Sequence, residues 1–389
     1  MTPAMNDAPR SSLARNLLLG LTALGAVGGA AVYVSAGPER FWANWLVWTL
    51  FLLTIGLGNL FLVALERLVG AHWSVPMRRV PERIASLIPL AIPLLFVALL
   101  GVPVLFPWTH DEAKHNPILI AKQPWLNLPF FAIRLVMCAV VWLLFYSFYV
   151  RGSLRQDESK DPAFTVRARK LAPPFMVAFF FTVTILAFDW ISGLEPEWYS
   201  DMFGVYLFAG TFVSGIAAMT QGVLGLIRRG RLTEVKDKHF YNLGTLGLAF
   251  TVFYSYIGFA QYMLIWYANL PEEVVWFKHR IDGAWYPVAL LLPLLHFFIP
   301  FFLLVSSLGK RSPRLLRIAT LSILLGHFVD LYWLIFPVLG SEPLFGWPEL
   351  AMACLFLGLG FLQIRRAMSR GADMPVGDPL LAKGLEWQL

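Results

Sequence analysis

The sequence predicts an all-α polytopic membrane protein with ten transmembrane helices. Of its 389 residues, 58% are hydrophobic and only 14% are charged, and the mean hydropathy is +0.65. A soluble protein of this composition would expose too much apolar surface. Ten apolar runs are long enough to cross a hydrocarbon core of about 30 Å. Because lipid offers the backbone no hydrogen-bond partners, we expect each run to be a helix.

The ten predicted helices follow one another along the chain, separated by short polar segments. They cover residues 17–36, 42–65, 84–106, 126–149, 173–194, 200–227, 240–266, 285–308, 315–337 and 349–364. The polar segment 1–15 is followed by no small-residue cleavage site, so we expect no cleaved signal peptide.

The positive charge is distributed unevenly between the two sets of loops. The formal net charge is +7, and most of the 31 lysine and arginine residues are predicted to lie on one side of the membrane. They lie in the N-terminus, in the loops that follow the second, fourth, sixth and eighth helices, and in the C-terminal tail. The opposite loops carry acidic residues without basic neighbours in sequence: Glu195, Glu197, Asp201, Glu342 and Glu349. This bias predicts that both termini are cytoplasmic. The basic excess therefore indicates topology and some attraction to anionic lipid, not nucleic-acid binding.

Two aspartates lie inside apolar runs, each at the same distance from a proline that ends the run. Asp189 and Asp330 each stand seven residues before a proline, Pro196 and Pro337, that ends the run. A charge at membrane depth is costly, so an intramembrane carboxylate indicates a functional site. The matching positions predict an internal repeat with one polar site in each copy.

The repeat predicts four parts of the chain. Helices 2–5 and 6–9 would form two four-helix bundles, and helices 1 and 10 would be peripheral. The N-terminal segment with the first peripheral helix would cover residues 1–41, and the first bundle 42–196. The second bundle would cover 197–338, and the last helix with its tail 339–389. The tail should lack a core of its own and either rest on a neighbour or be mobile.

Each predicted carboxylate has a candidate partner on the preceding helix. Arg134 lies at a depth similar to that of Asp189, so we expect an ion pair, which is the least costly form of buried charge. In the second copy His296 takes the place of the arginine, and His327 is on the same helix face as Asp330. Histidine releases a proton near neutral pH whereas arginine does not. The second copy therefore favours proton transfer. Two alternatives remain open: the Arg134–Asp189 pair only fixes the bundle, and the histidines are core side chains bonded to backbone carbonyls.

Three further residues extend the predicted proton path. Tyr254 and Tyr256 lie in an unusually polar stretch of the seventh helix, and Glu195 lies at the outer mouth near Asp189. Such groups can hold water between a carboxylate and the surface. The alternatives are that the tyrosines pack between helices and that Glu195 is a capping charge.

Known cofactor motifs do not occur in the sequence. No phosphate-binding lysine loop and no dinucleotide fingerprint is present. The two cysteines, Cys138 and Cys354, are too few for an iron–sulfur cluster, which needs about four thiolates. Only His296 and His327 are candidates for haem ligands within the predicted spans. We therefore expect no catalytic residue, metal or cofactor in this chain.

Three segments resemble a known family. FDWISGLEPEWYSDMFGVYLFAG, FTVFYSYIGFAQYMLIWYANLPEE and HFVDLYWLIFP are similar to the polysulfide-reductase membrane-subunit (NrfD-like) family, and within it to the membrane subunits of alternative complex III. The resemblance covers about residues 42–366. It implies ten helices in two four-helix bundles within the bacterial inner membrane.

The resemblance also implies a function. It indicates a cofactor-free subunit of a respiratory quinol:cytochrome c (or other periplasmic acceptor) oxidoreductase, with proton-conducting half-channels. The implied partners are an NrfD-like paralogue, an iron–sulfur protein, a multihaem cytochrome c, small membrane subunits and lipids; haem and iron–sulfur centres would lie in those partners. The alternatives are a direct quinol-binding subunit and a stand-alone secondary transporter.

Overall fold

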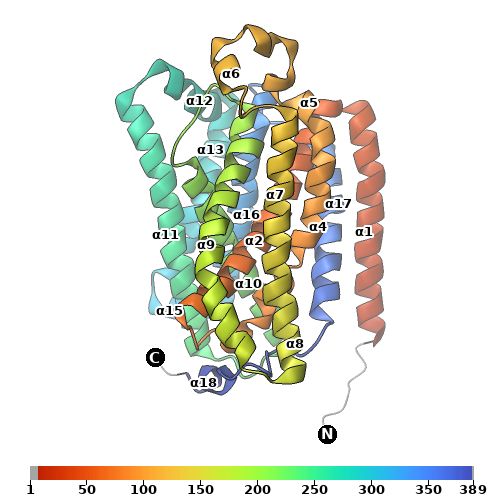
Figure 1. The fold of residues 1–389 in the computed structure, drawn as a ribbon, viewed down its shortest axis with the longest axis vertical. Helices are drawn as coiled ribbons and strands as arrows, with labels where there is room; N and C mark the ends of the chain where they lie inside the picture. The colour runs from red at the N-terminus through yellow and green to blue at the C-terminus, as the bar shows by residue number, and fades with distance from the viewer. Residues whose placement is uncertain (1–7, 388–389) are drawn as a thin grey trace.

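All regular secondary structure is helical in the part of the chain that the structure describes. The computed structural model describes residues 8–387, with side chains from residue 12 onward, and no strand occurs among them (Figure 1). Part of the polar N-terminal segment, residues 1–7, lies outside the described residues, as do 388–389 at the end of the tail. Ten helical spans are long and apolar enough to cross a membrane, which confirms the predicted number.

Helices of various lengths build these spans and the connections between them. In the first half they are α1 (Ala8–Ser35), α2 (Pro38–Val69), α3 (Arg79–Ile84), α4 (Leu87–Ala98), α5 (Val102–Leu105), α6 (Pro117–Lys122), α7 (Leu128–Tyr146), α8 (Gly152–Ser159) and α9 (Ala163–Trp190). In the second half they are α10 (Phe203–Ile227), α11 (Asp237–Ala268), α12 (Pro271–Ile281), α13 (Tyr286–Pro293), α14 (Ile299–Leu304), α15 (Ser307–Arg311), α16 (Pro313–Ile335), α17 (Trp347–Met368) and α18 (Leu381–Leu385).

The eighth span is interrupted at its middle by a π-helical turn. The turn η8 (Leu294–Phe298) separates α13 from α14, and Pro293 and Pro300 flank it. Proline lacks an amide hydrogen and disrupts the regular helical ladder, which explains the break. Such π-turns inside α-helices are often found at functional sites. His296, one of the predicted site residues, lies in this turn.

Helices α2 and α10 form the centre of the molecule. They are the most buried spans, and they pack against each other. At their crossing Gly58 lies so close to α10 that a Cβ atom there would be 2.1 Å from the carbonyl oxygen of Thr211 and 3.1 Å from the Cα of Gly215. The absence of both side chains lets the two backbones touch, as small residues do between membrane helices.

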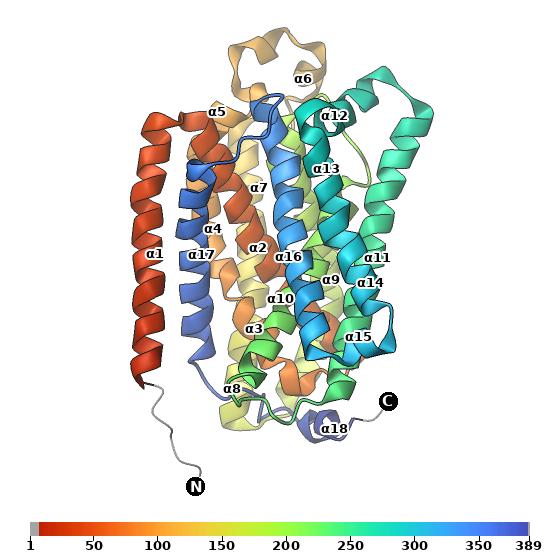
Figure 2. The same ribbon diagram turned by 180° about the vertical axis from the view of Figure 1, so that it is seen from behind.

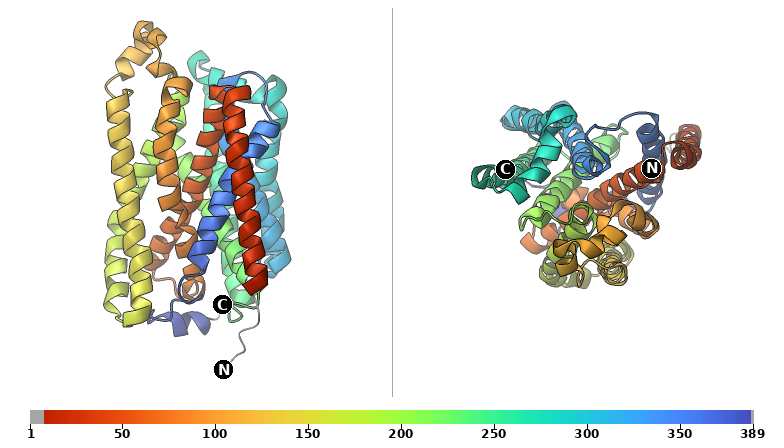
Figure 3. Two further views of the ribbon diagram at one scale, coloured as in Figure 1. Left: turned by 90° about the vertical axis from the view of Figure 1, so that its right-hand side faces the viewer. Right: turned by 90° about the horizontal axis from the view of Figure 1, so that it is seen from above.

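The remaining spans surround this central pair. Helix α2 contacts α4 and α9, and α7 also contacts both. Likewise α10 contacts α11 and α16, and α14 contacts both of those. Helix α1 lies at the edge of the molecule beside α17 (Figures 2 and 3). That contact depends on small residues, because a Cβ atom on Gly25 would meet the backbone of Leu355 at 2.1 Å.

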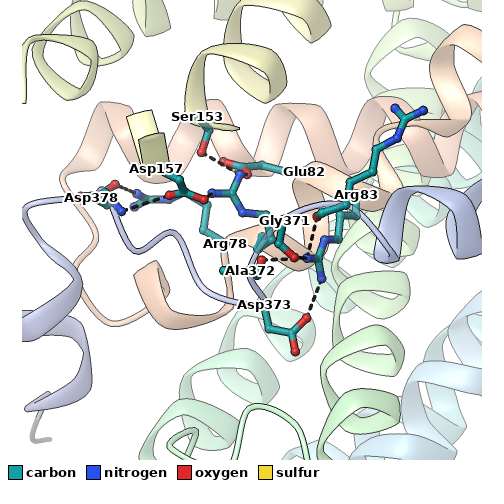
Figure 4. A network of polar contacts seen from close by, with 12 residues as sticks. Arg78, Glu82, Arg83, Ser153, Asp157, Gly371, Ala372, Asp373 and Asp378 are labelled. Carbon is teal, nitrogen blue, oxygen red and sulfur yellow. Dashed lines mark hydrogen bonds and ion pairs between the residues drawn. The ribbon is translucent and has the colours of Figure 1, made fainter. Parts of the chain in front are cut away.

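The two ends of the helix bundle differ in charge. Helices α8, α15 and α18 lie at one end, called here the basic end, and α5, α6 and α12 lie at the other, called the acidic end (Figure 1). At the basic end the segment after α17 returns across the helix termini. Its Asp373 pairs with Arg83, and its Asp378 pairs with Arg78 at 2.6 Å (Figure 4). The tail is therefore tied to the helices by a buried ion pair at Asp378 and a partly exposed one at Asp373, which the sequence did not predict.

Candidate functional site

The predicted ion pair between Arg134 and Asp189 is present. Arg134 on α7 donates to the two carboxylate oxygens of Asp189 on α9, from Nε at 2.7 Å and from Nη2 at 2.9 Å. Both residues are buried. This two-point arrangement is the strongest form of the arginine–carboxylate contact.

A tryptophan from the connecting segment completes this site. Trp125 donates its Nε1 hydrogen to Asp189 at 3.1 Å and accepts a hydrogen bond from Arg134 Nη1 on its carbonyl oxygen at 3.0 Å. The guanidinium also lies over the Trp125 ring, 4.2 Å from its centre. The pair is thus held in one position by several contacts, as a buried ion pair must be to offset its desolvation.

Asp330 has tyrosines as partners, not the predicted histidine. The hydroxyl of Tyr206 on α10 donates to the Asp330 carboxylate, and it lies 2.7 Å from the hydroxyl of Tyr254 on α11. All three side chains are buried. No hydrogen bond joins His296 to Asp330, and both ring nitrogens of His296 lack a hydrogen-bond partner among the described residues. The expected His296–Asp330 pairing is therefore wrong.

His296 is nevertheless next to this network. Its ring lies against the ring of Tyr254, with 3.9 Å between their centres. It approaches α16 closely, since a Cβ atom on Gly326 would be 2.8 Å from the His296 Cβ. The π-helical turn and the missing side chain at Gly326 together place this imidazole between α11 and α16.

His327 lies near His296 and contacts the central helix α2. Its Nε2 atom is 2.8 Å from the hydroxyl of Thr54, and its ring centre is 6.2 Å from that of His296. Gly210 on α10 packs beside this ring, since a Cβ atom there would be 3.4 Å from the His327 Nδ1. We call the buried set around α16 the α16 cluster. Its members are Thr54, Tyr206, Tyr254, His296, His327 and Asp330.

Tyr256 does not belong to the α16 cluster. It is 64% exposed on the outer surface of α11, although Tyr254 on the same helix is buried. Residues two apart on a helix point about 200° apart, so they cannot share a face. The assignment of Tyr256 to an internal path is therefore wrong.

Glu195 is engaged with a neighbouring helix at the acidic end. Its carboxylate accepts a hydrogen bond from the buried Arg280 of α12 and lies 3.7 Å from His279 Nδ1. Glu349 similarly pairs with Arg40 at 2.6 Å. These two acidic residues thus have basic partners, which come from segments far away in sequence.

Two members of the α16 cluster, Tyr206 and Thr54, were missed by reasoning from sequence. Tyr206 lies in the fourth position of α10, and Thr54 lies at the middle of α2. A hydroxyl inside an apolar run is a weak signal, since serine and threonine also bond to their own helix backbone. Thr54 does so as well, donating to the carbonyl oxygen of Leu50 at 2.7 Å.

The α16 cluster brings together groups that exchange protons. A carboxylate, two phenols and two imidazoles can each take up or release a proton. The first site differs, because its arginine keeps its proton. Within residues 8–387, no group of three or more His, Cys, Asp and Glu side chains is placed to hold a metal ion.

The fold and these sites define a class of protein. It is a multi-pass membrane protein that, over residues 8–387, is all-helical with ten apolar spans and buried titratable groups between them. Comparison with protein-family models gave no match, and neither did a search of curated proteins.

Proposed function

We propose that this chain is a cofactor-free integral membrane subunit of a respiratory quinol:cytochrome c (or other periplasmic acceptor) oxidoreductase, and that the α16 cluster transfers protons within it. The assignment to such a complex rests on the resemblance of three sequence segments to the NrfD-like family. The role in proton transfer rests on the geometry of the cluster.

The observation that carries the second part is the hydrogen-bonded series of Asp330, Tyr206 and Tyr254. A buried carboxylate is costly in a membrane, and intramembrane Asp and His residues commonly belong to proton relays. The Tyr206 hydroxyl is both donor to Asp330 and neighbour of the Tyr254 hydroxyl. Transfer of the Tyr206 proton to Asp330, with transfer of the Tyr254 proton to Tyr206, therefore moves the negative charge from α16 to α11. The His296 ring lies against Tyr254 and His327 bonds to Thr54 of α2, so both imidazoles lie beside the series without a hydrogen bond to it.

The two aspartates have different roles in this proposal. Asp189 accepts two hydrogen bonds from Arg134 and one from Trp125. Arginine does not release its proton in proteins. That site stabilises the packing of α7 against α9. Asp330 faces neutral hydroxyl groups instead, so its carboxylate is free to gain or lose a proton.

The proposal includes a duplicated architecture. Spans 2–5 and spans 6–9 are each a four-helix bundle of one repeat, with α2 and α10 as corresponding central helices. The ring of contacts among α2, α4, α7 and α9, and the similar ring among α10, α11, α14 and α16, support this arrangement. The basic end faces the cytoplasm of a bacterial cell, which follows from the positive-inside rule.

The test is Asp330→Asn in the assembled complex. We expect quinol oxidation to continue while fewer protons are released per electron, because asparagine cannot carry the proton. Asp201→Asn, at an exposed position of the acidic end, is the matched control. An unchanged proton-to-electron ratio in Asp330→Asn would contradict the proposal.

The same preparation distinguishes the alternatives. Photolabelling of this chain beside Asp330 by a quinone analogue would favour direct quinol binding by the chain itself. Purification of the chain without iron–sulfur or haem-containing partners would favour a stand-alone transporter.

A further inference from the structure

A cavity of about 330 Å³ opens at the basic end, away from the α16 cluster. It lies between the end of α2, the start of α9 and the C-terminal tail. Arg67 and Arg78 line it from one side, Arg169 from another, and Leu380 of the tail closes it. No residue of the proposed proton path takes part in it.

The cavity has an excess of positive charge. Arg67 and Arg78 are buried and share the single carboxylate of Asp378, at 2.7 and 2.6 Å. Glu66 is a second carboxylate, 3.4 Å from the Nε of Arg78. Arg169 is exposed and makes no ion pair within residues 8–387. The lining of the cavity itself thus contains three guanidinium groups and one carboxylate, that of Glu66, and an anion is suited to this excess.

The cavity is also partly apolar and lies at the level where membrane spans end. Val166 and Leu380 contribute apolar walls, and α2 ends at Val69 while the fifth span begins at Ala163. Basic residues at this level attract anionic lipid headgroups on the cytoplasmic side. Carbon-rich walls beside guanidinium groups match a phosphodiester with its glycerol, whereas a free phosphate would contact the guanidinium groups alone.

We propose that this cavity binds the phosphate headgroup of an anionic phospholipid, with Arg169 as the exposed donor and the buried Arg67 and Arg78 as the positive charges beside it. Guanidinium groups are well suited to phosphate because they offer paired hydrogens in one plane. The Asp378 contacts hold the tail over the site, so the lipid and the tail together close the basic end.

The test measures lipid binding to the purified full-length chain in detergent by native mass spectrometry. Phosphatidylglycerol is expected to bind more tightly than phosphatidylcholine. Arg169→Gln should weaken phosphatidylglycerol binding by about tenfold, the factor that corresponds to about 1.4 kcal/mol. Lys170→Gln removes the same charge one residue further along α9, outside the cavity, and should leave binding unchanged.

A second variant keeps all charges. Val166→Trp fills the cavity from a position that is 54% exposed, so the fold should tolerate it, and it should weaken phosphatidylglycerol binding as Arg169→Gln does. Equal binding by Arg169→Gln, Val166→Trp and Lys170→Gln would overturn the proposal. Displacement of phosphatidylglycerol by an equal concentration of inorganic phosphate would overturn the assignment to a lipid.

Discussion

Tyr206 and Asp330 are joined by a hydrogen bond although 124 residues separate them in sequence. The bond connects α10, at the centre of the molecule, with α16 at its side. In the first half of the chain, Asp189 is bonded to Arg134, 55 residues away. Two aspartates in the same sequence frame thus have partners of different chemistry, one a hydroxyl group and the other a permanent cation.

Removal of the Tyr206 hydroxyl should destabilise the protein and impair the proposed proton transfer. Tyr206→Phe leaves the buried Asp330 carboxylate without its donor, so we expect unfolding to become easier by about 1–3 kcal/mol. Tyr256→Phe removes the same hydroxyl from an exposed position on α11 and should change the stability little. Thermal unfolding of the two variants in one detergent makes the comparison, and equal midpoints would contradict the expectation.

Breaking the Arg134–Asp189 pair should be worse than removing it completely. Arg134→Met leaves an uncompensated buried carboxylate, and such changes destabilise by about 3–5 kcal/mol. The double variant Arg134→Met/Asp189→Leu removes both charges and should recover most of that loss. Chemical unfolding of the two single variants and the double variant gives the coupling energy. Additive effects would show that the pair does not act as a unit.

A methyl group added at the crossing of α2 and α10 should destabilise the protein. Gly58→Ala places a Cβ atom 2.1 Å from the Thr211 carbonyl oxygen, and the overpacking should destabilise by about 1–3 kcal/mol. Gly225→Ala on α10 is the control, because nothing lies within 4 Å of its Cβ position. That variant should be neutral or more stable by up to about 1 kcal/mol, since alanine is the better helix former. Equal unfolding midpoints for the two variants would contradict the close crossing.

Attachment of the C-terminal tail should depend on pH through Asp373. Burial raises the pKa of this carboxyl, but hydrogen bonds from Arg231 and Arg83 outweigh it and hold the pKa below the ordinary value. A depressed pKa means that the contribution to stability is complete above the unfolded-state value of about 3.9 and is lost as the pH falls through the folded-state pKa. Protection of residues 369–378 should therefore decrease only in strongly acidic solution.

Hydrogen exchange, corrected for its intrinsic pH dependence, measures that protection. Asp373→Asn should lower it already at neutral pH and remove the acidic transition. Asp111→Asn changes an exposed carboxylate at the opposite end, paired with Lys114, and should leave the tail as it is. If the acidic transition persists in Asp373→Asn, a group other than Asp373 causes it.

The order of helices along the chain was predictable because it depends on local composition. Each apolar run indicates a span without reference to the others, since a backbone in lipid satisfies its polar groups within the segment. The depth of Arg134 and Asp189 on consecutive antiparallel helices followed from the helical rise per residue. Their contact, which the structure shows, needed no information from the rest of the chain.

The partners of Asp330 were not predictable in the same way. Reasoning from neighbouring helices selected His296, but η8 turns this imidazole against Tyr254 instead. Tyr206 reaches Asp330 from α10, three spans earlier in the chain, and no sequence pattern encodes that meeting. The position of the C-terminal tail was not predictable for the same reason. Asp378 is buried only where Arg67 of α2 and Arg78 of the following loop lie beside it.

Ten apolar spans, one basic set of loops and two aspartates in a matching frame could all be established without coordinates. These properties depend on residues close together in the chain, and hydropathy and charge express them directly. The side chains that meet Asp330, the direction of Tyr256 and the contacts that hold the tail are set by tertiary packing. Those contacts arise where helices distant in sequence cross, and the closeness of each crossing depends on single glycines such as Gly58 and Gly326.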